Sequence, residues 1–144
     1  MPDAEIVLRR LRAICVKLPG AEEIVTWGHP TFRVDKKIFA VLEEYKGDLC
    51  VVFKTEKEHQ PMFLKDTRFF IAPYVGKHGW LSLKVGGRVN WTEVRHLVRD
   101  SHRLVSVASE GKRQKAKGEV NFRSAARHGL FAVCLLAILS AARG

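Results

Sequence analysis

Two short segments combine aromatic, histidine and cationic residues around the turn formers Gly and Pro. The first runs from Trp27 to Arg33 and the second from Ala72 to Trp80. Turns present their side chains at the margin of a sheet, where a partner can reach them. A cation such as Arg33 or Lys77 can meet a phosphate while a neighbouring ring lies against a sugar or a base. These segments therefore indicate anion binding, although their tryptophans would equally suit core or rim packing.

Further cations flank two predicted turns, one at Asp35-Lys36 and one at Gly86-Gly87. A hairpin with a cationic tip can act as a wing against the backbone of a duplex, whereas lysines at a sheet edge also discourage aggregation. The candidate nucleic-acid-binding residues are Arg33, Lys36, Lys37, Lys77, His78, Lys84 and Arg88.

The aromatic and histidine side chains of the same two segments suggest a different site. If the two turns meet in space, Trp27, His29, Tyr74 and Trp80 line a candidate pocket. A mostly apolar pocket with a few polar groups is typical of small-ligand sites. The alternative to DNA binding is therefore a protein-interaction or small-ligand module.

Catalytic patterns are absent from the sequence. The six histidines show neither the H-x-x-x-H nor the H-E-x-x-H spacing of a zinc site, and Gly76–Gly79 lacks the spacing of a phosphate loop. No serine or cysteine lies in a nucleophile-elbow or Cys-His context. His29 and His78 could meet as two metal ligands, but two neutral ligands without a third make a weak site. We predict that the chain is not an enzyme and has no metal or cofactor.

The charge of the 144-residue chain is +10 at pH 7, and it is unevenly spread. Residues 1–109 hold 18 Lys and Arg against 13 Asp and Glu, whereas residues 110–144 hold 7 against 2. A basic balance suits an anionic partner such as double-stranded DNA and also aids solubility. The three cysteines form no C-x-x-C pair, and the N-terminus lacks the pattern of a secretory signal. These features predict a cytoplasmic protein with reduced thiols.

Hydrophobic periodicity and turn signals predict an α+β fold. Helices are expected at 3–18 and 91–105, and strands at 24–27, 31–34, 37–42, 49–54 and 80–85. A further helix begins either at the capping-box pattern of Thr55–Glu58 or at Pro61 as a first-turn residue. Strands joined by such short turns are antiparallel neighbours. The expected architecture is a two-layer, antiparallel β-sheet with flanking helices.

The composition changes after Ser109, which divides the chain into three parts. We predict a folded domain at 1–109, a basic linker at 110–128 and an apolar C-terminal segment of unknown role at 129–144. The apolar run Gly129–Ala142 has 14 residues and would be about 21 Å long as a helix. The hydrocarbon core of a membrane is about 30 Å thick, so no membrane span is expected. The run could dock on the domain or lie at a dimer or membrane interface, and the sequence sets no oligomeric state.

Three motifs together resemble the MmcQ/YjbR family over about Ile6–Val105. They are the helix end at Leu18–Ala21 with Trp27–Arg33 after it, the segment Arg68–Trp80, and Trp91 at the start of the last helix. The resemblance implies a CyaY-like fold, as in bacterial frataxin, and a double-wing surface for DNA. It supplies no catalytic residues. The chain departs from the family where Pro61 interrupts the usual acidic helix.

From the residues and the resemblance together we predict a non-enzymatic DNA-binding domain of low sequence specificity. Its basic hairpin tips and the Lys77-His78 turn are expected to contact the phosphate backbone.

Overall fold

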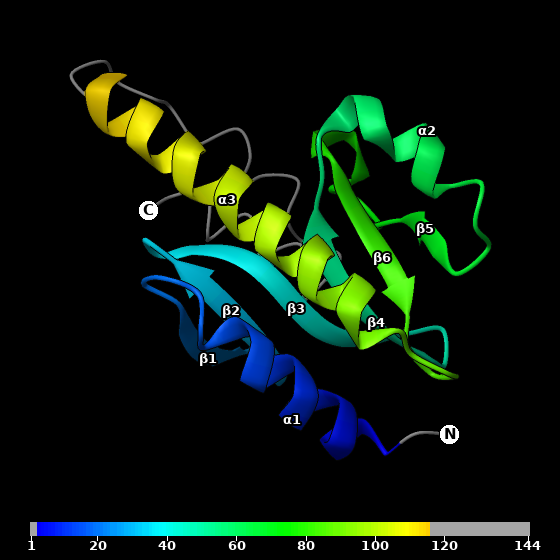
Figure 1. Ribbon diagram of the computed structural model, residues 1–144. Coiled ribbons are helices and arrows are strands. Elements are labelled where there is room, and N and C mark those ends of the chain that lie inside the picture. Colours follow the sequence, from blue (N-terminus) through cyan, green and yellow to red (C-terminus); the bar gives the residue numbers. More distant parts are fainter. Residues whose placement is uncertain (1–2, 116–144) are drawn as a thin grey trace.

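The computed structural model describes residues 3–115, with side chains as far as residue 108 (Figure 1). The helices are α1 (Ala4–Cys15), α2 (Gln60–Phe63) and α3 (Trp91–Lys115). The strands are β1 (Glu22–Thr26), β2 (His29–Val34), β3 (Lys37–Tyr45), β4 (Asp48–Lys54), β5 (Phe69–Ile71) and β6 (Trp80–Lys84). Two short 3-10 turns, η1 (Lys57–His59) and η2 (Gly76–His78), complete the described elements.

The six strands form one antiparallel sheet in the order β1-β2-β3-β4-β6-β5. The predicted α+β class, with an antiparallel sheet and flanking helices, is confirmed. The edge strand β5 was not expected, because three residues are too few to show the alternation that identifies a strand. It pairs with β6 from Phe69 to Ile71.

Tight two-residue turns join the first four strands. Positive φ angles occur at both central residues of Trp27-Gly28, Asp35-Lys36 and Lys46-Gly47. This backbone belongs to type I′ turns, whose twist matches that of the paired strands. The first turn is therefore Trp27-Gly28, and His29 and Pro30, which lie between the expected strands 24–27 and 31–34, belong to β2.

Helices α1 and α3 lie side by side on one face of the sheet, as Figure 1 shows. Their apolar stripes bury Val7, Leu11, Cys15, Val94, Val98 and Val105. These side chains share one core cluster with Phe32, Phe53 and Leu81 of the sheet. Burial of each large apolar side chain contributes about 1.5–3 kcal/mol, so this layer holds the fold together.

The segment after β4 explains the position of Pro61. The 3-10 turn η1 comes first, and the four-residue α2 follows with Pro61 in its first turn. Proline is favoured there because the first amides of a helix have no partner within it. The interpretation of Pro61 as a first-turn residue of a short helix agrees with the structure.

The last helix is longer than the sequence predicted. It was expected to end at Val105 but continues to Lys115, so residues 110–115 of the expected linker are helical. The remainder of that linker and the apolar segment 129–144 lie outside the described residues. In the part of the chain that is described, no helix is long and apolar enough to cross a membrane.

Candidate nucleic-acid interface

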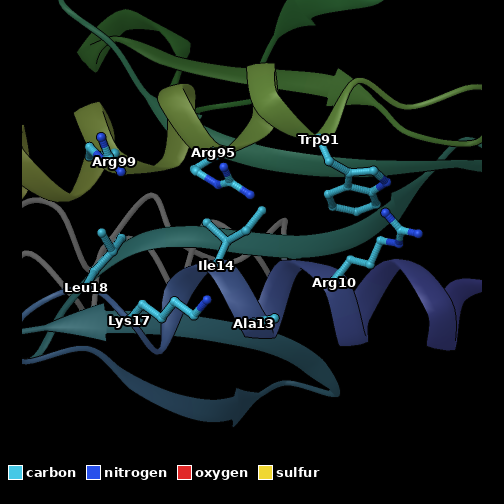
Figure 2. Close-up of a pocket in the computed structure, with 8 residues that line it drawn as sticks. All are labelled: Arg10, Ala13, Ile14, Lys17, Leu18, Trp91, Arg95 and Arg99. Atoms are coloured by element: carbon cyan, nitrogen blue, oxygen red, sulfur yellow. The ribbon is translucent and has the colours of Figure 1, made fainter.

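A groove between α1 and α3 gathers cationic side chains from both helices (Figure 2). Its volume is about 530 Å³. The lining residues are Arg10, Ala13, Ile14, Lys17, Leu18, Trp91, Arg95 and Arg99. Four of the eight are cationic and none is a carboxylate. We call this site the basic groove.

The α1 side of the basic groove is formed by the helix and by the turn after it. Arg10 lies on α1, and Lys17 lies in the turn that follows the last helical residue, Cys15. The small side chain of Ala13 lies between them, and the half-buried Ile14 lines the groove beside it. This face adjoins the core stripe, so the cations stand at the margin of the packed helix.

The α3 side repeats the arrangement at closer spacing. Trp91, Arg95 and Arg99 follow one another every four residues and therefore form one row along the helix. At about 1.5 Å per residue, this row is about 12 Å long. The basic groove thus offers cations along two nearly matched rows.

One end of the basic groove is ordered by an aromatic contact. The guanidinium carbon of Arg10 lies 5.7 Å from the ring centroid of the half-buried Trp91. Such a cation–π contact is worth about 0.5–1 kcal/mol at an exposed site. It joins the two helices and gives the end of the groove a flat aromatic platform (Figure 2).

The four cations of the basic groove have no ion-pair partner among the described residues, whereas Arg12, Arg68 and Lys84 each have at least one. Arg12, on the next face of α1, pairs with Glu23 at 2.6 Å. Its hydrogen bond raises the pKa of Arg12 and lowers the pKa of Glu23. Lys84 pairs with Asp48 at 3.1 Å. Carboxylates of the same fold therefore neutralise Arg12 and Lys84, while the groove cations stay unpaired.

Several contacts fix α3 on the sheet. The Ser101 hydroxyl donates to the Phe39 carbonyl at 2.6 Å and accepts from the Lys54 amide at 2.8 Å. At the start of the helix, Asn90 Oδ1 accepts from the amides of Thr92 and Glu93. These bonds satisfy backbone groups that a helix end leaves without partners. The row from Trp91 to Arg99 therefore stands on a rigid support.

An ion-pair network adds to the support at the N-terminal end of α3. Arg68 Nη1 contacts Glu93 at 2.8 Å, and Arg68 Nη2 contacts Asp66 at 2.6 Å. Hydrogen bonds to Asp66 and Glu93 raise the pKa of Arg68, and the bond from Arg68 lowers the pKa of Asp66. The network ties the loop before β5 to the first turn of the helix.

The position of α1 is set at both of its ends. Asp3 caps the helix by accepting from the Glu5 amide at 3.1 Å. Beyond the other end, the Pro19 carbonyl accepts from His102 Nε2 of α3 at 2.8 Å. This bond ties the turn after α1 to the middle of α3 and so helps to set the width of the basic groove.

The candidate residues predicted from the sequence do not form one surface. Lys36, Lys77 and His78 are exposed at the end of the sheet that carries the Asp35-Lys36 turn. Lys84 and Arg88 lie at the opposite end, because β6 runs away from η2. The predicted cations are therefore divided between two opposite ends of the sheet.

Two other predicted nucleic-acid-binding residues, Lys37 and Arg33, are not exposed at the hairpin tip where they were expected to contact phosphates. Lys37 is only 6% exposed, although Lys36 beside it is exposed. Arg33 lies half-buried in β2, where its Nη2 donates to Thr26 Oγ1 at 3.1 Å and its Nε is buried without a partner. Of this hairpin's predicted cations, only Lys36 projects at the tip.

His78 is placed where a positive charge is disfavoured. Partial burial lowers its pKa, and the charges of Lys77, Lys54 and Lys57 lower it further. A lowered pKa leaves the imidazole neutral at pH 7. His78 therefore adds no cation to the Lys77 turn.

The candidate aromatic pocket is not assembled. Trp27 lies at the β1–β2 turn, and its side chain is 60% exposed, while His29 follows it at the start of β2. Tyr74 and Trp80 lie at the other end of the sheet, where Trp80 is buried. His29 and His78 are likewise at opposite ends. Among the described residues, no three His, Cys, Asp or Glu side chains gather to hold a metal.

Sequence reasoning missed the basic groove. Neither the cations of the first helix nor those of the last were among the candidate residues. The available signal was the row of Trp91, Arg95 and Arg99 at four-residue spacing, together with Arg10 and Lys17 in and just after another helix. What the sequence could not supply was the packing that sets these two rows side by side.

Comparison with known proteins supports the fold and the family. The family model YjbR matches residues 16–104. The crystal structure of Deinococcus radiodurans protein DR2400, with the domain DUF419, is similar with a TM-score of 0.59 and 20% identity, covering 69% of this chain and 78% of that one. No curated protein matches the chain. Because the family model spans more than half of its length, the chain belongs to the YjbR family.

Proposed function

We propose that the chain is a non-enzymatic domain that binds double-stranded DNA through the basic groove, with low sequence specificity. The observation that carries the proposal is the convergence of four cations from α1, the turn after it and α3, without an ion-pair partner among the described residues or a carboxylate in the lining. Such groups bind phosphates and release the counterions around the duplex. The cytoplasmic location expected from the sequence is part of this proposal.

Low specificity follows from the shape of the surface. A single helix with its side chains is about 10–12 Å wide, and the major groove of DNA is about 12 Å wide. Two helices side by side therefore cannot enter it together. The cations between them meet the protruding phosphates instead, and phosphate contacts carry no sequence information.

A second candidate ligand is a compact aromatic anion such as a mononucleotide. The platform of Trp91 at one end of the basic groove, with Arg95 and Arg99 beyond it, could stack a base and bind its phosphates. The groove volume of about 530 Å³ also lies within the usual range of small-ligand pockets, roughly 300–1,000 Å³. Duplex and mononucleotide are therefore compared in one test.

The test is fluorescence anisotropy of a labelled duplex titrated with the full chain. The reversal Arg95→Glu/Arg99→Glu changes the groove charge by four units. At about 0.9 log units per unit of charge in 0.1 M salt, the affinity should fall by about 3.6 orders of magnitude. The matched control is Lys36→Glu/Lys77→Glu, which changes the same charge at the end of the sheet and should alter the affinity by less than about threefold.

Equal losses in the two variants would mean that DNA responds to net charge alone, and the groove would lose its role. Wild-type protein that binds a labelled mononucleotide but no duplex would replace the proposal with the second candidate. A preference for single-stranded over double-stranded DNA would keep the groove but change its ligand. Circular dichroism of each variant verifies that it is folded.

A further inference from the structure

The face of the sheet away from α1 and α3 is also apolar at its centre. One row crosses all six strands through successive paired residues: Ile24, Thr31, Val41, Val52, Ser82 and Phe70. The neighbouring row, from Phe32 through Phe53 to Leu81, belongs to the helix-covered core. Because adjacent residues of a strand point to opposite sides, the first row lies on the other face. We call this side the second face.

The centre of the second face is fully buried. On this face, the side chains of Thr31, Ile38, Val41, Cys50, Val52 and Ser82 are at most 1% exposed. None of them belongs to the core cluster formed with α1 and α3. Strand β3 is buried without interruption from Lys37 to Glu43. An antiparallel strand with one solvated face would alternate instead.

The described helices do not account for this burial. Helices α1 and α3 pack on the opposite face (Figure 1). Helix α2 packs on that same opposite side, since its Phe63 ring contacts the rings of Phe53 and Phe69. Within residues 3–115, each of the three helices therefore leaves the second face uncovered.

We propose that the apolar segment Gly129–Ala142 of the same chain packs across the second face. Its 14 residues would form a helix about 21 Å long, and the nine-residue strand β3 is about 30 Å long. A helix that is apolar all round is stable in water only when it is buried. The sheet would then lie between two helical layers.

The connection is long enough for this return. Ser101 contacts the end of β4, so α3 continues for 14 residues beyond that end of the sheet, or about 21 Å. The 13 residues 116–128 can span up to about 43 Å when extended. The chain can therefore pass around the edge of the sheet and reach the centre of the second face.

Two buried cysteines make the proposal testable in the full chain. Cys50 lies on the second face, and Cys15, the last residue of α1, lies in the core on the other face. Burial raises the pKa of both thiols, and that of Cys50 rises to about 12. With Cys134→Ala removing the third thiol, both should resist a thiol reagent in the native protein.

The disrupting variant is Leu135→Glu/Leu139→Glu in that background, and the matched control is Asn121→Glu/Ser124→Glu outside the apolar run. We expect Cys50 to react at least tenfold faster in the first variant while Cys15 stays protected. The control should protect both thiols. Unchanged protection of Cys50 in a disrupted run would overturn the proposal, and protection that rises with protein concentration would assign the cover to a second copy.

Equal exposure of both cysteines would mean that the disrupting variant has unfolded. A second measurement then decides the question without disrupting the run. A nitroxide on Cys134, in a full chain carrying Cys15→Ala and Cys50→Ala, should broaden the amide signals around Val41 and Val52. It should spare those around Arg10 and Trp91. Broadening absent at Val41 and Val52 would contradict the proposal.

Discussion

The basic groove and the turn around η2 both carry exposed cations, but the fold builds them in opposite ways. The groove cations lie on α1, on the turn after it and on α3, and within the described residues they make no ion pair. Their one described contact is the cation–π contact of Arg10 with Trp91. The η2 turn is held by hydrogen bonds that its backbone carbonyls accept. Gln60 Nε2 donates to the Gly76 carbonyl at 2.8 Å, and the Thr55 amide donates to the Gly79 carbonyl at the same distance.

This difference leads us to expect that the basic groove, and not the η2 turn, is available for binding. The cations of the groove are not part of the core, so substitutions of these residues should change binding and leave stability intact. The η2 turn closes the connection between β5 and β6, so substitutions there should change stability and leave DNA binding intact. A cation next to turn residues is therefore weaker evidence of a binding site than cations that converge from two elements.

The largest expected effect is on the stability of the η2 turn. Gly79 has a φ of +91°, and a Cβ added there would collide with the Thr55 carbonyl oxygen. Gly79→Ala should lower the free energy of unfolding by about 3 kcal/mol, from the left-handed backbone together with the collision. Urea denaturation monitored by circular dichroism measures the change.

Gly28→Ala is the matched control, because Gly28 has a φ of +80° but no atom within 4 Å of an added Cβ. It should cost only about 1 kcal/mol. If both variants lose the same free energy of unfolding, the structure must have shifted to remove the collision at Gly79. A loss of DNA affinity in folded Gly79→Ala would break the separation of the two regions.

A smaller effect is expected inside the basic groove. Trp91→Ala removes the platform beneath Arg10, which should weaken duplex binding about threefold, the equivalent of one exposed cation–π contact. Trp91→Phe should retain most of the affinity. If the ligand is a stacked mononucleotide, the loss in Trp91→Ala should be tenfold or more, because base stacking on an aromatic ring is worth about 1–3 kcal/mol.

The smallest expected effect is the contribution of His78 to the pH dependence of the free energy of unfolding. Its pKa is lower in the folded state than in the unfolded state, where it is near 6.5. The unfolded chain therefore binds a proton more readily, and wild-type stability should fall as the pH drops below about 6.5. His78→Gln should remove this part of the slope between pH 7.5 and pH 5, as measured by urea denaturation. Duplex affinity at pH 7.5 should not change, since the imidazole is already neutral.

Much of the fold could be predicted from local patterns. The stripes of the two long helices and the runs of the first four strands are periodic enough to show in the sequence. Turn residues set their antiparallel order. The three-residue β5 and the extension of α3 to Lys115 were missed, because the first is too short for periodicity and the second has a polar composition typical of a linker.

The candidate site was less accessible to sequence reasoning. Lys37 looks like a hairpin-tip cation, yet the next strand begins there and buries it. Lys84 looks available until the β3–β4 turn brings Asp48 beside it. Arg10 and Arg95 look like ordinary solvated residues because 75 residues of sequence separate α1 from α3. Charge pairing and convergence are tertiary properties, which is why the sequence did not indicate them.

The most direct test of the central claim is the salt dependence of duplex binding by the full chain. Four phosphate contacts predict that log K falls with log salt at a slope of about −3.6. Arg95→Ala/Arg99→Ala should reduce the slope to about −1.8, whereas Lys36→Ala/Lys77→Ala should leave it near −3.6. An unchanged slope in the groove variant, or an equal reduction in the control, would contradict the assignment of DNA binding to the basic groove.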